Sequence, residues 1–237
     1  MRAEPLVVLP GFMADARLFW HQIISFSPSR PVHVASLARG GTIEDMAEEV
    51  LADAPPHFAA IGHSLGALVA MEILRRAPDR VSRIALADVS ALPETPQVSA
   101  LREPRIARAR AGKLTEAMLE EIPPEALAPG PEQTAVLAMM IEMAEDLGGE
   151  VFQRQSRALM RRPDQQRALR NTKVRALLLC GEHDTICPPR RHEFLAELMP
   201  HASFRMIRDA GHLSPLEQPE RVTQALREWL DAPLLLK

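Results

Sequence analysis

The chain has 237 residues, of which 46% are hydrophobic, so it is long enough to bury a large core as one domain with an insertion. This composition excludes a disordered or fibrous protein, and no run of 18 apolar residues indicates a membrane span. The formal net charge of -3 argues against a polyanionic partner such as nucleic acid for the chain as a whole.

Short apolar runs at residues 6–9, 32–35 and 58–61 lack the polar–apolar alternation of a half-exposed strand. Such runs are typical of strands that are buried on both faces of a parallel sheet. A helical pattern over residues 42–54, with Thr42 as its N-cap, separates the second run from the third. This part of the chain therefore predicts an α/β fold with helices on both faces of the sheet.

The third run leads directly into the sequence GHSLG at residues 62–66, and a helical pattern follows up to Pro78. A strand that passes into a helix through Gly-x-Ser-x-Gly makes a very tight turn, in which small residues flank a strained, protruding serine. The helix N-terminus beneath the serine favours a developing negative charge. The same pentapeptide also occurs by chance as a simple helix cap, but the flanking strand and helix favour a nucleophilic Ser64.

A fourth apolar run, residues 84–87, precedes a long stretch without a convincing strand. Residues 93–172 contain only amphipathic helical pieces, which are separated by prolines and glycines. We therefore expect a core of residues 1–92 and 173–237 that is interrupted by a helical insertion of residues 93–172.

Two further apolar runs, residues 176–180 and 203–207, are each followed by a titratable residue. Asp184 comes just after the first run, and His212 comes just after the second. A serine hydroxyl needs a base that takes its proton and a third group that orients this base. The order Ser64, Asp184, His212 is the one expected for a catalytic triad on this architecture.

In this order, the serine, acid and histidine motifs resemble those of the α/β-hydrolase superfamily, and the resemblance extends over about residues 6–230. It implies an α/β-hydrolase fold in which the insertion forms a helical cap. It also implies an oxyanion hole made by the backbone N–H groups of Phe12 and Leu65. Pro10 takes the place of a histidine that many relatives have. We expect the usual N-terminal hairpin of the family to be missing, and the resemblance then implies a mostly parallel sheet of about six strands.

Other residues near these motifs have competing roles. Asp88, after the fourth run, is a rival for the acid, because some relatives carry the acid there, but Asp184 matches the Gly-x-x-Asp pattern better. His63 is expected to pack or to form hydrogen bonds rather than to react. Trp20, close to the oxyanion turn, is expected in the core.

The resemblance implies a serine hydrolase that cleaves a carboxylic ester or thioester of a small to medium apolar acyl group through an acyl-enzyme. It implies no metal and no organic cofactor, and a serine nucleophile excludes relatives that use aspartate. Two alternatives stay open: a lactonase similar to the enol-lactone hydrolases, and a non-enzymatic ligand receptor on the same fold.

The insertion is expected to shape the pocket, with Phe12 of the core and Met139 and Met143 of the insertion as candidate substrate contacts, although methionines at helical spacing are more often core residues. Its basic residues fall in two groups: Arg102, Arg105, Arg108, Arg110 and Lys113, then Arg154, Arg157, Arg161, Arg162, Arg167 and Arg170. With few acids nearby, they are candidates for docking an acyl carrier protein or coenzyme A. The chain is similar in core motifs to the methyl esterases of pimeloyl-carrier-protein esters; the alternative is that these arginines only solvate helix faces.

The two cysteines, Cys180 and Cys187, have no second Cys/His cluster at metal-ligand spacing. The first apolar run is also too short for a signal peptide. We therefore expect reduced thiols in a cytoplasmic protein that does not associate with membranes.

Overall fold

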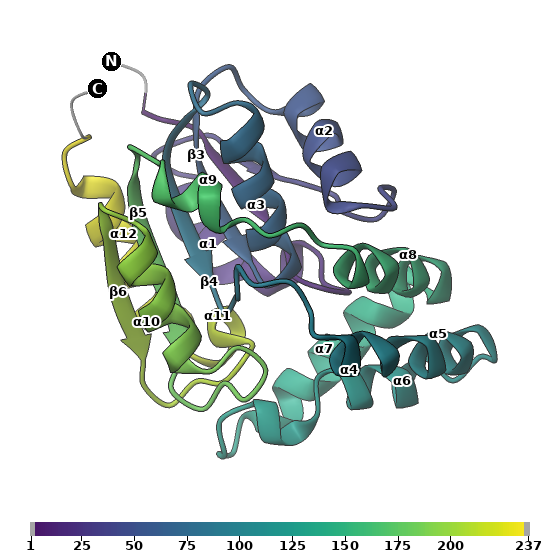
Figure 1. Cartoon of the computed structure of the whole chain (residues 1–237). Helices are drawn as coiled ribbons and strands as arrows, with labels where there is room; N and C mark the ends of the chain where they lie inside the picture. Colours follow the sequence, from purple (N-terminus) through teal and green to yellow (C-terminus); the bar gives the residue numbers. More distant parts are fainter. Residues whose placement is uncertain (1–2, 235–237) are drawn as a thin grey trace.

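A parallel sheet forms the centre of the protein in a computed structural model, which describes residues 3–234 (Figure 1). In chain order its strands are β1 (Leu6–Leu9), β2 (Val32–Val34), β3 (Phe58–His63), β4 (Val81–Ala87), β5 (Arg175–Gly181) and β6 (Ala202–Ile207). They lie in the order β2-β1-β3-β4-β5-β6, and each neighbouring pair is parallel. The prediction of a parallel sheet of about six strands is therefore confirmed.

The two edge strands differ from the prediction that all strands are buried on both faces. Val34 in β2 is 38% exposed and Met206 in β6 is 44% exposed, whereas all residues of β1 and β3 are buried. An edge strand has a neighbour on one side only, so part of each of its faces remains in contact with water. The apolar runs therefore predicted the strands correctly but did not distinguish edge strands from central ones.

Helices cover both faces of the sheet (Figure 1). One face carries α2 (Ile43–Asp53), α3 (Leu65–Arg76), α9 (Gln166–Arg170) and α10 (Pro189–Leu198). The other face carries η1 (Ala16–Phe19), α1 (Trp20–Phe26), α11 (Ser214–Glu217) and α12 (Pro219–Asp231). The predicted cap of α2 is confirmed, since the Asp45 N–H donates a hydrogen bond of 3.0 Å to Thr42 Oγ1.

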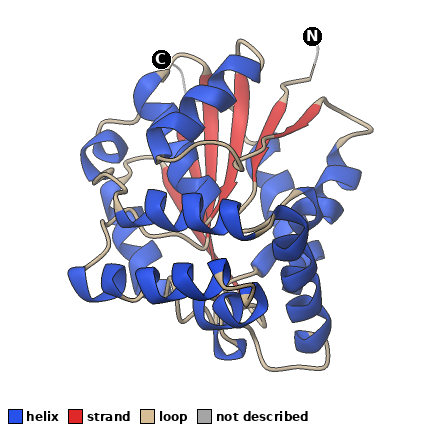
Figure 2. Cartoon of the chain, turned by 90° about the vertical axis from the view of Figure 1, so that its right-hand side faces the viewer, coloured by secondary structure: helices blue, strands red, loops and turns tan. Residues whose placement is uncertain are grey.

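The remaining helices come between β4 and β5: α4 (Pro96–Ala100), α5 (Arg102–Arg110), α6 (Leu114–Glu121), η2 (Pro124–Ala126), α7 (Gln133–Leu147) and α8 (Gly149–Met160). They lie beyond the carboxyl ends of the strands, below the sheet in Figures 1 and 2. Helix α5 packs against α6 and α8, and α7 packs against the same two helices. Each amphipathic helix thus buries its apolar face against its neighbours, beyond the edge of the sheet where active sites of α/β folds lie.

Trp20 is 60% exposed, so the expectation that it belongs to the core is wrong. Helix α1 packs against α12 through the side that carries Gln22 and Phe26, and Trp20 does not lie on that side. Within the described part of the chain, no helix has the length and apolar character needed to cross a bilayer.

Candidate active site

Ser64 occupies the turn between β3 and α3 in a strained backbone conformation. Its φ of 48° and ψ of -113° lie in a region that residues with a side chain rarely adopt. The Ser64 N–H donates a hydrogen bond of 2.9 Å to the carbonyl oxygen of Ala87 at the end of β4. The turn therefore presents the serine hydroxyl beyond the sheet and leaves little room for other conformations.

The two glycines of the turn are needed because backbone lies against both of them. A Cβ atom on Gly66 would lie 2.1 Å from the carbonyl oxygen of Leu9, and one on Gly62 would lie 2.6 Å from Cα of Ala67. Contacts this short cannot be relieved by a side-chain rotation, since the opposing atoms belong to the backbone. The Gly-x-Ser-x-Gly spacing thus follows from the close approach of α3 to β1 and β3.

The structure brings together the three side chains that the sequence predicts as a triad. His212 Nε2 lies 3.2 Å from Ser64 Oγ, and His212 Nδ1 lies 2.9 Å from Asp184 Oδ2. Asp184 follows β5 and His212 follows β6, so both reach the edge of the sheet where β3 ends. The three groups form one continuous chain of hydrogen-bonding atoms from serine to carboxylate.

The surroundings of Asp184 keep its carboxylate ionised. Burial by itself raises the pKa of this carboxyl, but the His212 imidazole and the N–H groups of Ile186 and Cys187, both 2.8 Å from Oδ1, lower it below its ordinary value. Burial likewise opposes protonation of His212, yet the charge of Asp184 outweighs it and raises the pKa of His212 above 6.5. The imidazole is therefore a stronger base than an isolated histidine.

Asp88, the rival acid, lies near the triad but does not contact the His212 ring by a hydrogen bond. Its Oδ1 accepts from the Gly181 N–H at 2.9 Å, and its Oδ2 accepts from the Ser214 hydroxyl at 2.5 Å. Burial and the nearby charge of Asp184 hold its pKa well above the ordinary value. The geometry favours Asp184 as the group that orients the histidine.

His63 stabilises the backbone of His212. Its Nε2 lies 2.6 Å from the His212 carbonyl oxygen, and because a carbonyl only accepts, Nε2 carries the proton and donates. Burial and the neighbouring His212 lower the pKa of His63 to about 3, so its ring is neutral. This arrangement matches the hydrogen-bonding role expected for His63.

Glu217, which the sequence analysis did not single out, holds the loop that carries His212. Its carboxylate accepts hydrogen bonds from the backbone N–H groups of Ala128 at 2.7 Å, Gly211 at 2.9 Å and Leu213 at 3.0 Å. These bonds join the loop after β6 to the segment after η2. A glutamate five residues after the histidine was the only signal in the sequence, and its three partners are unpredictable without the fold.

Phe12 and Leu65 are the expected oxyanion donors, and Phe12 lines the same pocket as Ser64. Phe12 follows β1, and Leu65 begins α3; neither N–H donates a hydrogen bond to any residue that the structure describes. The next residue, Met13, donates its N–H to Gln155 Oε1 at 2.8 Å, and Gln155 Nε2 donates to the Leu37 carbonyl at 3.0 Å. Gln155 of α8, a second residue missed by the sequence analysis, thus fixes the loop of Phe12.

A small pocket of about 50 Å³ opens at Ser64 and His212. Apolar side chains from the core and the inserted helices form part of its wall, among them Phe12, Leu68, Ile122 and Leu159. Three charged residues, Arg102, Glu121 and Arg162, form another part.

Met139 and Met143, the candidate substrate contacts of the insertion, are not among the residues that line this pocket, whereas Phe12 is. Met143 is fully buried and Met139 is partly buried against the core. Both belong to α7, which packs against α6 and α8. Their side chains therefore fill space between helices, as methionines at helical spacing usually do.

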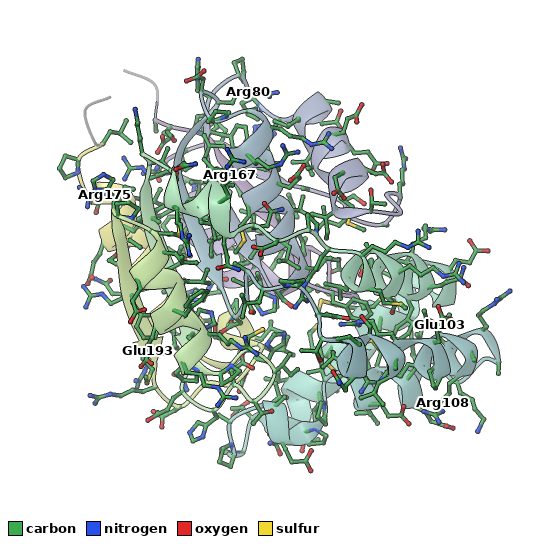
Figure 3. All side chains as sticks on the ribbon, viewed as in Figure 1. Arg80, Glu103, Arg108, Arg167, Arg175 and Glu193 are labelled. Atoms are coloured by element: carbon green, nitrogen blue, oxygen red, sulfur yellow. The ribbon has the colours of Figure 1, made fainter. Side chains whose placement is uncertain are left out.

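The basic residues of the insertion do not form one positive patch, contrary to the expectation that few acids lie nearby. Residues 93–172 contain eleven Arg and Lys but also twelve Asp and Glu. Arg105 Nη1 lies 2.7 Å from Glu121 Oε2, and Arg108 pairs with Glu120. In Figure 3, Arg108 lies at the outer end of the inserted helices, whereas Arg167 of α9 lies beside α3. Ion pairing and this separation weaken any common field.

The thiol of Cys187 lies close enough to Asp184 and His212 to form a set of three metal-ligand atoms. Ligand atoms of Asp184, Cys187 and His212 all lie within 4.8 Å of one another. Burial raises the pKa of the Cys187 thiol well above its ordinary value, which disfavours the thiolate that metals bind. Because Asp184 and His212 are also hydrogen bonded to each other, the group is better suited to proton transfer than to metal binding.

Comparison with known protein families and proteins places the chain among the α/β hydrolases. A sequence model of the alpha/beta hydrolase family matches residues 6–225. A pimeloyl-[acyl-carrier protein] methyl ester esterase from Aromatoleum aromaticum is 26% identical over 211 residues, which cover 82% of each chain.

Solved structures agree with this fold. A thermophilic esterase from Thermogutta terrifontis, 27% identical, superposes with a TM-score of 0.85 over 96% of this chain and 89% of its own. The enol-lactonase from Burkholderia xenovorans LB400, 23% identical, gives the same TM-score over 98% and 93%.

Proposed function

Because the chain belongs to the α/β-hydrolase family, we propose that it hydrolyses a carboxylic ester through an acyl-enzyme formed on Ser64. The observation that carries this proposal is the chain of contacts from Ser64 Oγ to His212 and on to Asp184, at 3.2 and 2.9 Å. Such a chain is what a serine needs in order to act as a nucleophile near neutral pH.

In the first half of the reaction, His212 Nε2 takes the proton of Ser64 while Oγ bonds to the ester carbonyl carbon. The negative charge that develops on the carbonyl oxygen is stabilised by the N–H groups of Phe12 and Leu65, which have no other acceptor among the described residues. His212 then returns the proton to the departing alcohol oxygen, which leaves the acyl group on Ser64.

In the second half, a water molecule takes the place of the alcohol. His212 accepts a proton from the water as its oxygen attacks the acyl carbon, and it protonates Ser64 as the acid leaves. In both halves, Asp184 Oδ2 accepts a hydrogen bond from the Nδ1–H group of His212, and the ionised carboxylate stabilises the imidazolium. Two N–H groups on its other oxygen keep the carboxylate in place.

The pocket favours a small substrate. Its volume of about 50 Å³ is far below the roughly 300–1,000 Å³ of sites that enclose drug-sized ligands. A short acyl group fits beside Leu68 and Leu159, whereas a long chain requires the inserted helices to move.

Hydrolysis of p-nitrophenyl esters from two to twelve carbons, by the wild type and by Ser64→Ala, tests the proposal. We expect the wild type to prefer two to four carbons and the variant to lose at least about 1,000-fold in kcat. Equal rates in both proteins would refute the role of Ser64. A folded wild type that binds esters without turning them over would favour a receptor, and faster opening of lactones would favour a lactonase.

An ester linked to an acyl carrier protein is a second candidate, because the relative from Aromatoleum aromaticum is named for such a substrate. The half-buried Arg157 and the exposed Arg161 at the end of α8 have no ion-pair partner among the described side chains. Arg110, Arg167 and Arg170 also form no ion pair among the described side chains, but only Arg157 and Arg161 lie next to each other at the end of α8, where they could meet an acidic carrier.

A further inference from the structure

The buried Arg102 and the mostly buried Arg162 line the pocket at Ser64, which is unusual for a site that takes only apolar acyl groups. Arg102 comes from the start of α5, and Arg162 comes just after α8. The side chains are 6% and 16% exposed, respectively. A guanidinium remains charged at every physiological pH, so each of these groups needs a compensating partner.

Arg102 has its partners within the protein. Its Nε lies 3.0 and 2.9 Å from the two carboxylate oxygens of Glu94, and its Nη2 lies 2.5 Å from one of them. Its Nη1 donates to Glu121 Oε1 at 2.7 Å. Every nitrogen of this guanidinium therefore has an anionic acceptor.

Arg162 is compensated less well. Its Nε donates to the neutral carbonyl of Leu92 at 3.0 Å, and its Nη1 reaches Glu94 Oε1 only at 3.3 Å. Glu94 is already bound by Arg102, so one carboxylate serves two guanidinium groups. Among the described residues, Arg162 Nη2 donates no hydrogen bond.

Glu121, the acid that lines the pocket, does not supply the negative charge that Arg162 lacks. It binds Arg102 through Oε1 and Arg105 through Oε2, both at 2.7 Å. Three guanidinium groups thus share the two carboxylates of Glu94 and Glu121, and Arg105 reaches the half-exposed Glu120 only at 4.0 Å. Burial also lowers the pKa of Arg162, whose neighbours Arg102 and Arg191 add positive charge.

We propose that Arg162 binds a carboxylate of the substrate, so that the preferred substrate is a short ester that also carries a carboxylate, such as the monoester of a small dicarboxylic acid. This inference rests on the proposed function and names the substrate class of the same site. The free Nη2 donates a charge-assisted hydrogen bond to the carboxylate. Because Arg162 and Ser64 share a pocket of about 50 Å³, only a few bonds separate the carboxylate from the ester.

A matched pair of substrates tests the inference. Monoethyl succinate carries the carboxylate, and ethyl succinamate replaces it by a neutral amide of almost the same shape. We expect kcat/KM of the wild type, followed by ethanol release, to be about 10- to 100-fold higher for the anion. Equal values for the two esters would overturn the proposal.

Variants of Arg162 separate charge recognition from a structural role. Arg162→Gln should remove the preference, with a loss of about 10- to 100-fold for monoethyl succinate and less than about threefold for ethyl succinamate. Arg162→Lys should retain part of it, since it keeps the charge but not the planar fork. The exposed Arg190 of α10 supplies the matched control, Arg190→Gln, which should change neither value. Equal losses on both esters in both Arg162 variants would contradict substrate recognition.

A binding measurement distinguishes failure of this inference from failure of the proposed function. Titration calorimetry with Ser64→Ala should show tighter binding of monoethyl succinate than of ethyl succinamate, and Ser64→Ala/Arg162→Gln should lose this difference. If the wild type hydrolyses p-nitrophenyl acetate but Ser64→Ala does not discriminate between the two ligands, the inference is wrong and the proposed function stands. Discrimination without any turnover would support the anion site and refute the esterase.

Discussion

His212 must be neutral to act as a base, which makes the activity depend on pH. The charge of Asp184 outweighs burial and raises the pKa of His212 above 6.5. Protonation below this pKa removes the base, so kcat/KM should rise with pH through an apparent pKa above 6.5 and then level off. A profile of kcat/KM against pH for p-nitrophenyl acetate measures this limb.

Asp184→Asn provides the corresponding test of the acid. We expect kcat to fall by about 1,000- to 10,000-fold, because an amide stabilises neither the required tautomer nor the imidazolium. The remaining activity should show a lower apparent pKa. An unchanged profile in this variant, or a comparable loss in Asp88→Asn alone, would move the role of the acid to Asp88.

Glu217 is proposed as a positioning residue, since it binds the N–H groups on both sides of His212. Glu217→Gln keeps one acceptor oxygen but turns an N–H₂ group toward backbone donors. We expect kcat to fall by about 10- to 100-fold with KM changed less than threefold. Kinetics combined with urea unfolding checks this, because a purely structural role would lower the free energy of unfolding and leave kcat of the folded fraction intact.

At the scale of elements, Glu72 connects α3 to the end of the insertion. This carboxylate is buried and accepts hydrogen bonds from Arg75, Arg76 and, at 3.2 Å, Gln165. Burial raises its pKa, but the hydrogen bonds from these partners outweigh burial and lower the pKa to about 2. A folded-state pKa below the unfolded value of 4.5 stabilises the protein above pH 4.5, and this stabilisation is lost as the pH falls toward 2.

Glu72→Gln should therefore lower the free energy of unfolding at pH 7 by about 2 kcal/mol and reduce its dependence on pH between 4.5 and 2. Urea denaturation at several pH values measures both effects. The matched control is Glu48→Gln on α2, an exposed partner of Arg76 at 3.5 Å, which should cost less than about 0.5 kcal/mol. Equal effects of the two substitutions would show that the hydrogen bonds of the buried Glu72, including the one from Gln165 just before α9, add nothing to the free energy of unfolding.

At the scale of the whole molecule, the distribution of charge decides whether a carrier protein docks. We expect neutralisation of Arg154, Arg157 and Arg161 together to lower kcat/KM for a carrier-linked methyl ester at least about tenfold at low salt, if a carrier is the partner. The value for p-nitrophenyl acetate should not change. Identical kinetics with the carrier-linked ester before and after the substitutions would remove the carrier from consideration.

Two features that the sequence predicted correctly, the parallel sheet and the serine turn, follow from local sequence patterns. Apolar runs without alternation specify buried strands, and glycines on both sides of Ser64 specify the turn, because their neighbours in sequence already determine the backbone path. Even so, the same runs did not distinguish the edge strand β6 from a central one, since exposure depends on which strands become neighbours.

The sequence did not show which residues of the insertion form ion pairs with one another. Arg102 and Arg162 looked like members of two basic surface groups, yet Glu94 and Glu121 bring them into the pocket wall. Met143, a candidate substrate contact in the sequence, is fully buried among the inserted helices. A helical pattern shows that a face is apolar or charged but does not show which helix covers it.

The sequence by itself determined the fold class, the position of Ser64 in a strained turn, and Asp184 and His212 as the residues that meet it, because the order of parallel strands carries their carboxyl ends to one edge. Only the tertiary structure decided the contents of the pocket and the contacts of Gln155, Glu217 and Arg162. These contacts join residues between 4 and 142 positions apart in the chain, and most of them depend on packing of the inserted helices against the core rather than on a local pattern.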